Sequence, residues 1–94
     1  MTLSKITKVT VPDHILSQNV RGESVLLNLD NECYFGLDKV GARMWNVLSE
    51  SNSIRKAYDA LFNRYDVEAD VLYNDLMEFV EKMVGHGLLK IDDK

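Results

Sequence analysis

The segment from Ser24 to Leu48 limits the possible folds of this chain more than any other, because it predicts two strands and a helix in immediate succession. Ser24–Leu29 and Glu32–Leu37 are rich in residues that favour extended backbone, and Asp30-Asn31 between them is typical of a tight turn. Asp38 is suited to begin a helix, since its carboxylate can accept hydrogen bonds from the N–H groups of the first turn. The apolar residues that then recur at helical spacing are Val40, Met44, Trp45 and Leu48.

One further strand is predicted before this hairpin. Ile6–Val11 alternates apolar and polar residues, which is the pattern of a half-buried strand, and Pro12 ends it because proline has no N–H to donate. The pattern of Ile15–Val20 is ambiguous between a loop and a short extended piece. Arg21-Gly22-Glu23 is expected to turn the chain into the hairpin.

Two amphipathic helices are predicted after the first one, which should end near Ser49-Glu50. The second begins after Asn52 or Ser53, and its apolar residues recur at i, i+3, i+4, i+7, i+8 and i+11 from Ile54. The third extends from Ala69 to Val84 and is ended by the two glycines that follow, since glycine readily adopts the left-handed conformation that closes a helix. After these glycines, Leu88, Leu89 and Ile91 are expected to pack back onto the core. Residues 92–94 are expected to fray.

The order of strands and then helices predicts an α+β fold. We expect one domain over residues 1–94, winged-helix-like, with an N-terminal three-stranded antiparallel sheet followed by three α-helices. No apolar run approaches the ~18 residues that a membrane-spanning helix needs. The N-terminus lacks a continuous apolar stretch and a small-residue cleavage site, which predicts a cytoplasmic protein.

The sequence offers little for catalysis. His14 and His86 lie far apart, and the lone Cys33 has no second cysteine with which to form a disulfide or a zinc site. The five glycines match no phosphate-binding or dinucleotide-binding pattern. We therefore expect no metal, no cofactor and no enzymatic activity. The acidic residues of the third helix fit a solvated surface better than a catalytic pair: Asp70, Asp75, Glu78 and Glu81.

The charge is unevenly distributed, although the formal net charge is only −4. Residues 1–65 carry eight basic and seven acidic side chains, whereas residues 66–94 carry three basic and eight acidic ones. An acidic third helix repels phosphate and favours a basic or neutral peptide. A winged-helix DNA-binding regulator remains an alternative, because the second helix is more basic, with Arg55, Lys56 and Arg64. A third possibility is a module that dimerises through its open strand edge.

Four short segments, in order, resemble the PqqD-like family, whose members are also called RiPP recognition elements and bind peptides that are ribosomally made and then modified. They are Val25–Asn28, Tyr34–Leu37, Val40-Gly41 with Met44-Trp45, and Asp75-Leu76 with Phe79-Val80. The resemblance covers about residues 9–91. One departure is the turn Asp30-Asn31-Glu32, where many relatives have a glycine.

The resemblance implies a winged-helix-like protein that captures the leader segment of a precursor peptide. The leader would add as an antiparallel strand to the third strand, with its side chains in a groove beside the third helix. The implied partner is a separate enzyme, either a radical-SAM enzyme or a leader protease of the lasso-peptide type, and the protein would be a monomer or a strand-exchanged dimer. The expected peptide-binding residues are Glu32, Cys33, Tyr34, Phe35, Gly36, Leu37, Leu72, Asp75, Leu76, Phe79 and Met83.

Several of these residues also have a structural interpretation. Trp45, Leu76 and Val80 are expected in the core, while Phe79 and Met83 fit the core, the groove or both. The glycine at 41 is expected to allow close packing of the first helix against the sheet, and the glycine at 36 to relieve crowding. From charge alone, Asp75 and Glu78 are predicted to select a Lys or Arg, or a backbone N–H, of the leader.

Overall fold

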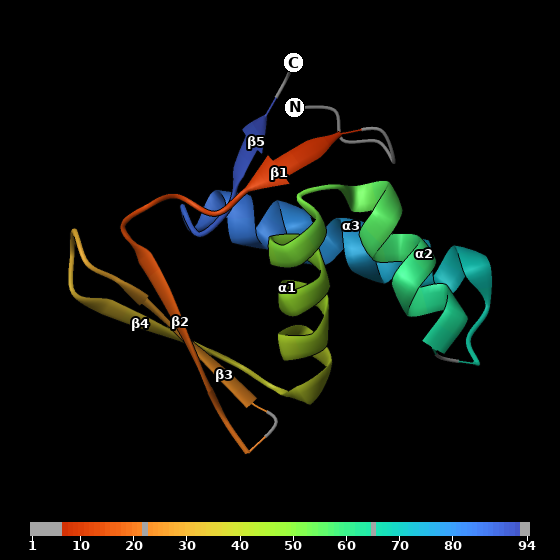
Figure 1. The fold of residues 1–94 in the computed structure, drawn as a ribbon, viewed down its shortest axis with the longest axis horizontal. Helices are drawn as coiled ribbons and strands as arrows, with labels where there is room; N and C mark the ends of the chain where they lie inside the picture. The colour runs from red at the N-terminus through yellow and green to blue at the C-terminus, as the bar shows by residue number, and fades with distance from the viewer. Residues whose placement is uncertain (1–6, 22, 65, 93–94) are drawn as a thin grey trace.

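The structure is a computed structural model that describes residues 7–21, 23–64 and 66–92. A three-stranded sheet lies on one side of the first helix, and the other two helices lie on its opposite side (Figure 1). The elements in chain order are β1 (Lys8–Thr10), β2 (Ile15–Val20), β3 (Glu23–Asn28), β4 (Cys33–Leu37), α1 (Lys39–Ser51), α2 (Ile54–Arg64), α3 (Ala69–Gly85) and β5 (Lys90–Asp92).

The three-stranded antiparallel sheet has the order β2-β3-β4, which confirms the predicted α+β class. Its membership differs from the prediction, because β2 is the ambiguous segment and the expected first strand is not part of this sheet. Five of the six residues of β2 are exposed. Because neither face of this strand is buried along its length, apolar and polar residues do not alternate in its sequence. A short turn fixes its pairing with β3, since Val20 lies opposite Glu23 and Arg21 has a left-handed φ of 54°.

The first strand pairs instead with the end of the chain. β1 is antiparallel to β5, with Val9 opposite Ile91, and the two form a separate two-stranded sheet (Figure 1). The prediction that residue 92 frays was wrong, because Asp92 pairs with Lys8. Of the expected strand 6–11, residue 6 lies outside the described residues, as do residues 93 and 94 of the expected frayed end.

The helix ends follow the predicted chemistry with small differences. Asp38 caps α1, its Oδ1 accepting a hydrogen bond of 2.8 Å from the N–H of Gly41. Asn52 is the left-handed C-cap of α1, with φ 55°, and Ser53 is the residue whose hydroxyl accepts from the N–H of Lys56 at the start of α2. α3 ends at Gly85, one residue further than predicted. The left-handed residue that follows it is Gly87, with φ 75°.

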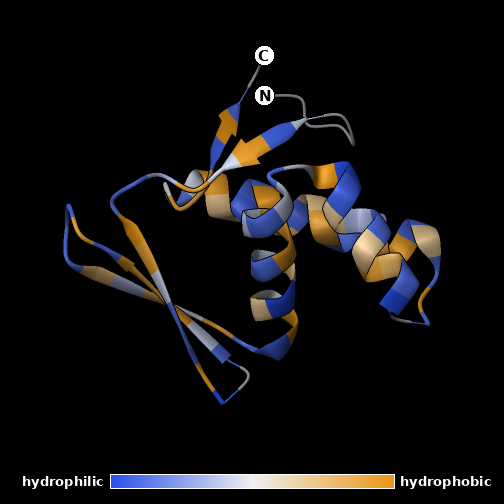
Figure 2. Ribbon diagram, viewed as in Figure 1, coloured by the Kyte–Doolittle hydropathy of each residue, from blue (hydrophilic) through white to orange (hydrophobic). Residues whose placement is uncertain are grey.

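The core gathers around α1, which packs against the sheet and against both other helices. Trp45 is 1% exposed, and Leu76 and Val80 are fully buried, which confirms their predicted core positions. The ribbon of α1 alternates between hydrophilic and hydrophobic segments, as an amphipathic helix does (Figure 2). No helix in the described part of the chain combines the length and the apolar character that crossing a membrane requires.

Candidate peptide-binding groove

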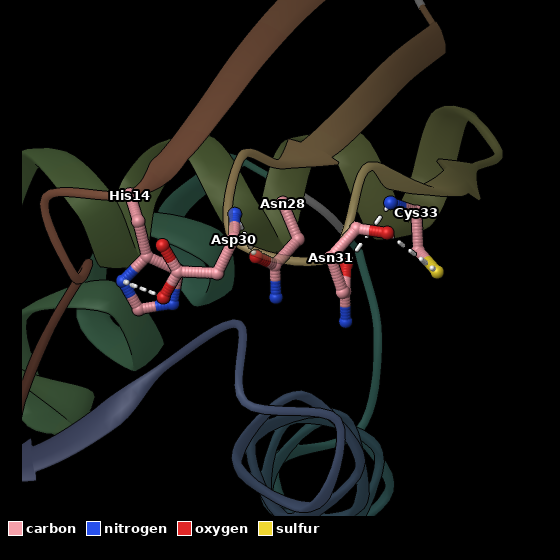
Figure 3. Close-up of polar contacts among 5 residues, drawn as sticks. All are labelled: His14, Asn28, Asp30, Asn31 and Cys33. Atoms are coloured by element: carbon pink, nitrogen blue, oxygen red, sulfur yellow. Dashed lines mark hydrogen bonds and ion pairs between the residues drawn. The ribbon is translucent and has the colours of Figure 1, made fainter.

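The turn between β3 and β4 decides where the edge strand begins. The side-chain oxygen of Asn28 accepts from the N–H of Asp30 at 2.9 Å, and that of Asn31 accepts from the N–H of Cys33 at 3.0 Å (Figure 3). Such Asx turns hold the backbone of a short loop without help from the core. Glu32 has a φ of 58° and belongs to the turn, so the strand starts at Cys33 and not at Glu32 as predicted.

β4 forms one edge of the three-stranded sheet. Among the described residues it pairs only with β3, and the sequence CYFGL carries no charged side chain. An edge strand presents unpaired N–H and C=O groups, and proteins usually protect such an edge with charges, proline or a cover. An uncharged edge is therefore well suited to accept an added peptide strand.

Side chains of β4 alternate between the two faces of the sheet. Phe35 and Leu37 lie opposite Leu26 and Ser24 on the face toward α1, where Leu26 is fully buried. Tyr34 and Gly36 lie on the other face, and Tyr34 is 74% exposed. A C-β atom added to Gly36 would meet nothing within 4 Å, so the expected crowding at this glycine is absent.

A groove with a volume of about 370 Å³ separates β4 from α3. Its lining comes from three elements: the end of β4, the first turns of α1, and one face of α3. The lining residues are Phe35, Gly36, Leu37, Asp38, Val40, Gly41, Met44, Asp75, Glu78, Phe79, Lys82 and Met83.

Six of the eleven predicted binding residues line this groove: Phe35, Gly36, Leu37, Asp75, Phe79 and Met83. The other five are placed elsewhere. Cys33 and Tyr34 line a smaller hollow at the start of β4, and Glu32 lies in the turn. Leu72 lines a different hollow among the helices, and Leu76 is fully buried, so it supports α3 from within the core.

The contribution of α1 to the groove was missed. Val40 and Met44 belong to the apolar residues that recur at helical spacing and were not among the expected binding residues, yet both line the groove and Val40 is 63% exposed. The sequence did carry a signal for this, because α1 follows β4 after Asp38 alone. Gly41 fits the predicted close packing at this junction, since an added C-β would lie 3.4 Å from Leu37 and 3.3 Å from the capping carboxylate.

One end of the groove is formed by a contact between its two walls. The Phe35 ring of β4 lies 4.9 Å from the ring of His86, centroid to centroid, and Lys82 of α3 places its Nζ 5.5 Å from the Phe35 centroid. The charged side chains along the groove are otherwise acidic, and all are exposed: Asp38, Asp75 and Glu78. This surface favours a peptide with a positive charge near α3.

No group of three potential metal ligands occurs in residues 7–21, 23–64 and 66–92. Cys33 is exposed, and its sulfur lies 3.7 Å from the backbone oxygen of Asn31 in the turn (Figure 3). The groove thus combines a free strand edge, an apolar floor and an acidic rim, which together suit an extended peptide.

Known proteins resemble this chain in sequence and in fold. Residues 23–89 match the family described as coenzyme PQQ synthesis protein D (PqqD). The solved structure of TbiB1 in complex with the TbiA(beta) leader peptide is 33% identical, with a TM-score of 0.81, over 86% of this chain and 94% of that chain. Lasso peptide synthetase B1 complexed with the leader peptide is 19% identical over 88% of this chain and 98% of that chain, and its TM-score of 0.78 supports the fold.

No curated protein sequence matches the chain. The family match nevertheless covers well over half of its residues, including β3, β4 and all three helices. The chain belongs to the PqqD family.

Proposed function

We propose that this protein binds the leader segment of a ribosomally made precursor peptide and presents it to a separate enzyme. The leader adds as an antiparallel strand to β4, and its side chains enter the groove beside α3. The observation that carries the proposal is the uncharged free edge of β4 beside that groove. Membership of the PqqD family and the likeness to TbiB1, which was solved with a leader peptide, support it.

Main-chain hydrogen bonds to β4 would supply binding that tolerates sequence variation, and the groove would select side chains. The apolar floor accepts aliphatic or aromatic residues through the partly exposed ring of Phe79, with the fully buried Met83 packed beneath it. Asp75 and Glu78 favour a Lys or Arg. We expect a dissociation constant between about 1 μM and tens of nanomolar, or roughly −8 to −10 kcal/mol.

The protein has no catalytic role in this proposal. It raises the effective concentration of the reacting segment at the partner enzyme, which is either a radical-SAM enzyme or a lasso-type leader protease. It acts as a monomer or as a strand-exchanged dimer that leaves β4 free, because self-pairing through β4 would occupy the edge that the leader needs. A cytoplasmic location stays a prediction.

DNA binding is the rival function, and the charges of α3 oppose it. A recognition helix presents Arg, Lys, Asn or Gln to the bases and phosphates. Here the exposed face of α3 carries four acidic side chains, with Lys82 as its only Lys or Arg.

Calorimetric titration tests the proposal. The ligands are the leader of the short precursor encoded beside this gene and a DNA duplex, each at 50 and 300 mM salt. We expect saturable leader binding that changes by less than about threefold between the two salt concentrations, whereas a protein–DNA complex loses affinity steeply. Binding of the duplex without binding of the leader would reject leader recognition in favour of the regulator.

A further inference from the structure

A second hollow lies among the three helices, next to the groove. Its volume is about 250 Å³, and most of its lining is apolar. We call it the helical pocket. Six apolar residues line it together with the charged residues Lys39, Arg43 and Asp75: Val40, Met44, Leu61, Val67, Val71 and Leu72. Three of the apolar residues are exposed: Val40 at 63%, Val67 at 42% and Val71 at 49%.

The helical pocket is continuous with the peptide-binding groove. Val40, Met44 and Asp75 line both hollows. A peptide that leaves the groove along this side therefore passes the exposed carboxylate of Asp75 and enters the pocket directly. Exposed apolar side chains that line a hollow beside a binding groove offer an apolar contact to the bound ligand.

The direction of the bound leader decides which part of it reaches the pocket. β4 runs from Cys33 to Leu37 and continues through Asp38 into α1. A strand added antiparallel to β4 runs the opposite way, so its N-terminal end lies beside Leu37 and its C-terminal end beside Cys33. The residues that precede the paired segment therefore lie near the first turns of α1, where Val40 opens into the helical pocket.

We propose that the helical pocket binds one large apolar side chain of the leader, located N-terminal to the segment that pairs with β4. This inference rests on the proposed function and adds a second anchor to it. The apolar lining selects an aliphatic or aromatic side chain. The volume is below the range of about 300–1,000 Å³ that is typical of small-molecule sites, so the pocket suits a side chain better than a free ligand.

The same polarity places the other end of the peptide. The C-terminal end of the leader leaves beside Cys33 and the β3–β4 turn, on the side away from the helical pocket. The enzyme that acts on the following segment then works at this turn, and the helical pocket is free to act as an anchor alone.

Two variants and two peptides test the second anchor. Val71→Gln makes the rim of the helical pocket polar, and Val20→Gln is the matched control, because Val20 on β2 is also 49% exposed. The peptides are the full leader of the precursor encoded beside this gene and the same leader shortened from its N-terminus to the segment that pairs with β4. Affinities are measured by calorimetry, and circular dichroism melting checks that both variants fold.

We expect the full leader to bind Val71→Gln about tenfold more weakly than wild type, and Val20→Gln as wild type. The shortened leader should bind all three proteins alike, at the weakened affinity. Equal binding of both peptides to wild type, or full affinity in Val71→Gln, would overturn the second anchor while leaving the groove in place. Loss of self-association in Val71→Gln at unchanged leader affinity would also overturn it and assign the pocket to a second copy. Absence of any leader binding to wild type would instead reject the proposed function.

Discussion

The Nζ atom of Lys82 lies 5.5 Å from the centroid of the Phe35 ring, so a cation of α3 covers an aromatic ring of β4 at the end of the peptide-binding groove. This contact joins the two walls between which the leader is proposed to lie. The Phe35 ring also lies beside His86, so two side chains of the α3 end hold it in place.

Replacing this cation should have a small, local effect on stability. Lys82→Met keeps an unbranched side chain of similar reach but removes the charge above Phe35. We expect the free energy of unfolding to fall by about 0.5–1 kcal/mol, which is typical of an exposed cation–π contact. Urea denaturation measures this, with Lys56→Met on α2 as the control. Equal losses in the two variants would show that the contact with Phe35 contributes nothing specific.

Phe79 should contribute to leader binding through its partly exposed ring in the groove. Phe79→Ala is expected to weaken binding about tenfold, or ~1.4 kcal/mol, because the leader loses apolar contact area there. Phe62→Ala is the matched control, since Phe62 is 44% exposed on α2 and lies outside the groove. Fluorescence anisotropy of a labelled leader measures both. If the two variants bind alike, the groove beside α3 is not the binding site.

The acidic rim predicts a charge preference. The double variant Asp75→Asn, Glu78→Gln should bind a leader that carries a Lys or Arg about two- to fivefold more weakly, in keeping with exposed charge pairs of 0.2–1 kcal/mol. The effect should shrink at high salt, since salt screens exposed charges. The pair Glu50→Gln, Asp59→Asn on α1 and α2 removes the same charge away from the groove. If both double variants bind the leader equally weakly, its affinity depends only on the net charge of the protein and the acidic rim has no specific role.

Glu32 sits in a backbone conformation that glycine adopts more easily. Its φ of 58° is left-handed, which costs a residue with a C-β roughly 1–2 kcal/mol. Glu32→Gly relieves this but makes the unfolded chain more flexible. We expect a net gain of about 0.5 kcal/mol in the free energy of unfolding by urea denaturation. Glu23→Gly, in strand β3, should be destabilising. A loss of stability in Glu32→Gly would contradict the left-handed turn.

The elements that could be predicted from the sequence are those with a local signal. The hairpin, its Asp38-capped helix and the two later helices follow from turn residues, capping and apolar spacing, all of which act within a few residues. β2 was ambiguous because its exposed residues give no alternation. The pairing of β1 with β5 joins segments at opposite ends of the chain, and no local pattern encodes it.

The candidate site was predicted in the same way. The strand edge and one face of α3 could be inferred, because strand and helix periodicity identify which residues share a face. The contribution of Val40 and Met44 depends on how α1 packs beside β4, which periodicity does not determine. Leu76 shares the α3 face but points into the core, where it is fully buried.

An amide chemical-shift titration of isotope-labelled protein with the leader peptide tests the central claim most directly. We predict saturable shifts along Cys33–Leu37 and on the face of α3 that lines the groove, with none from a DNA duplex. Shifts confined to Arg55, Lys56 and Arg64 on addition of DNA, with no response to the leader, would contradict leader recognition and favour the regulator.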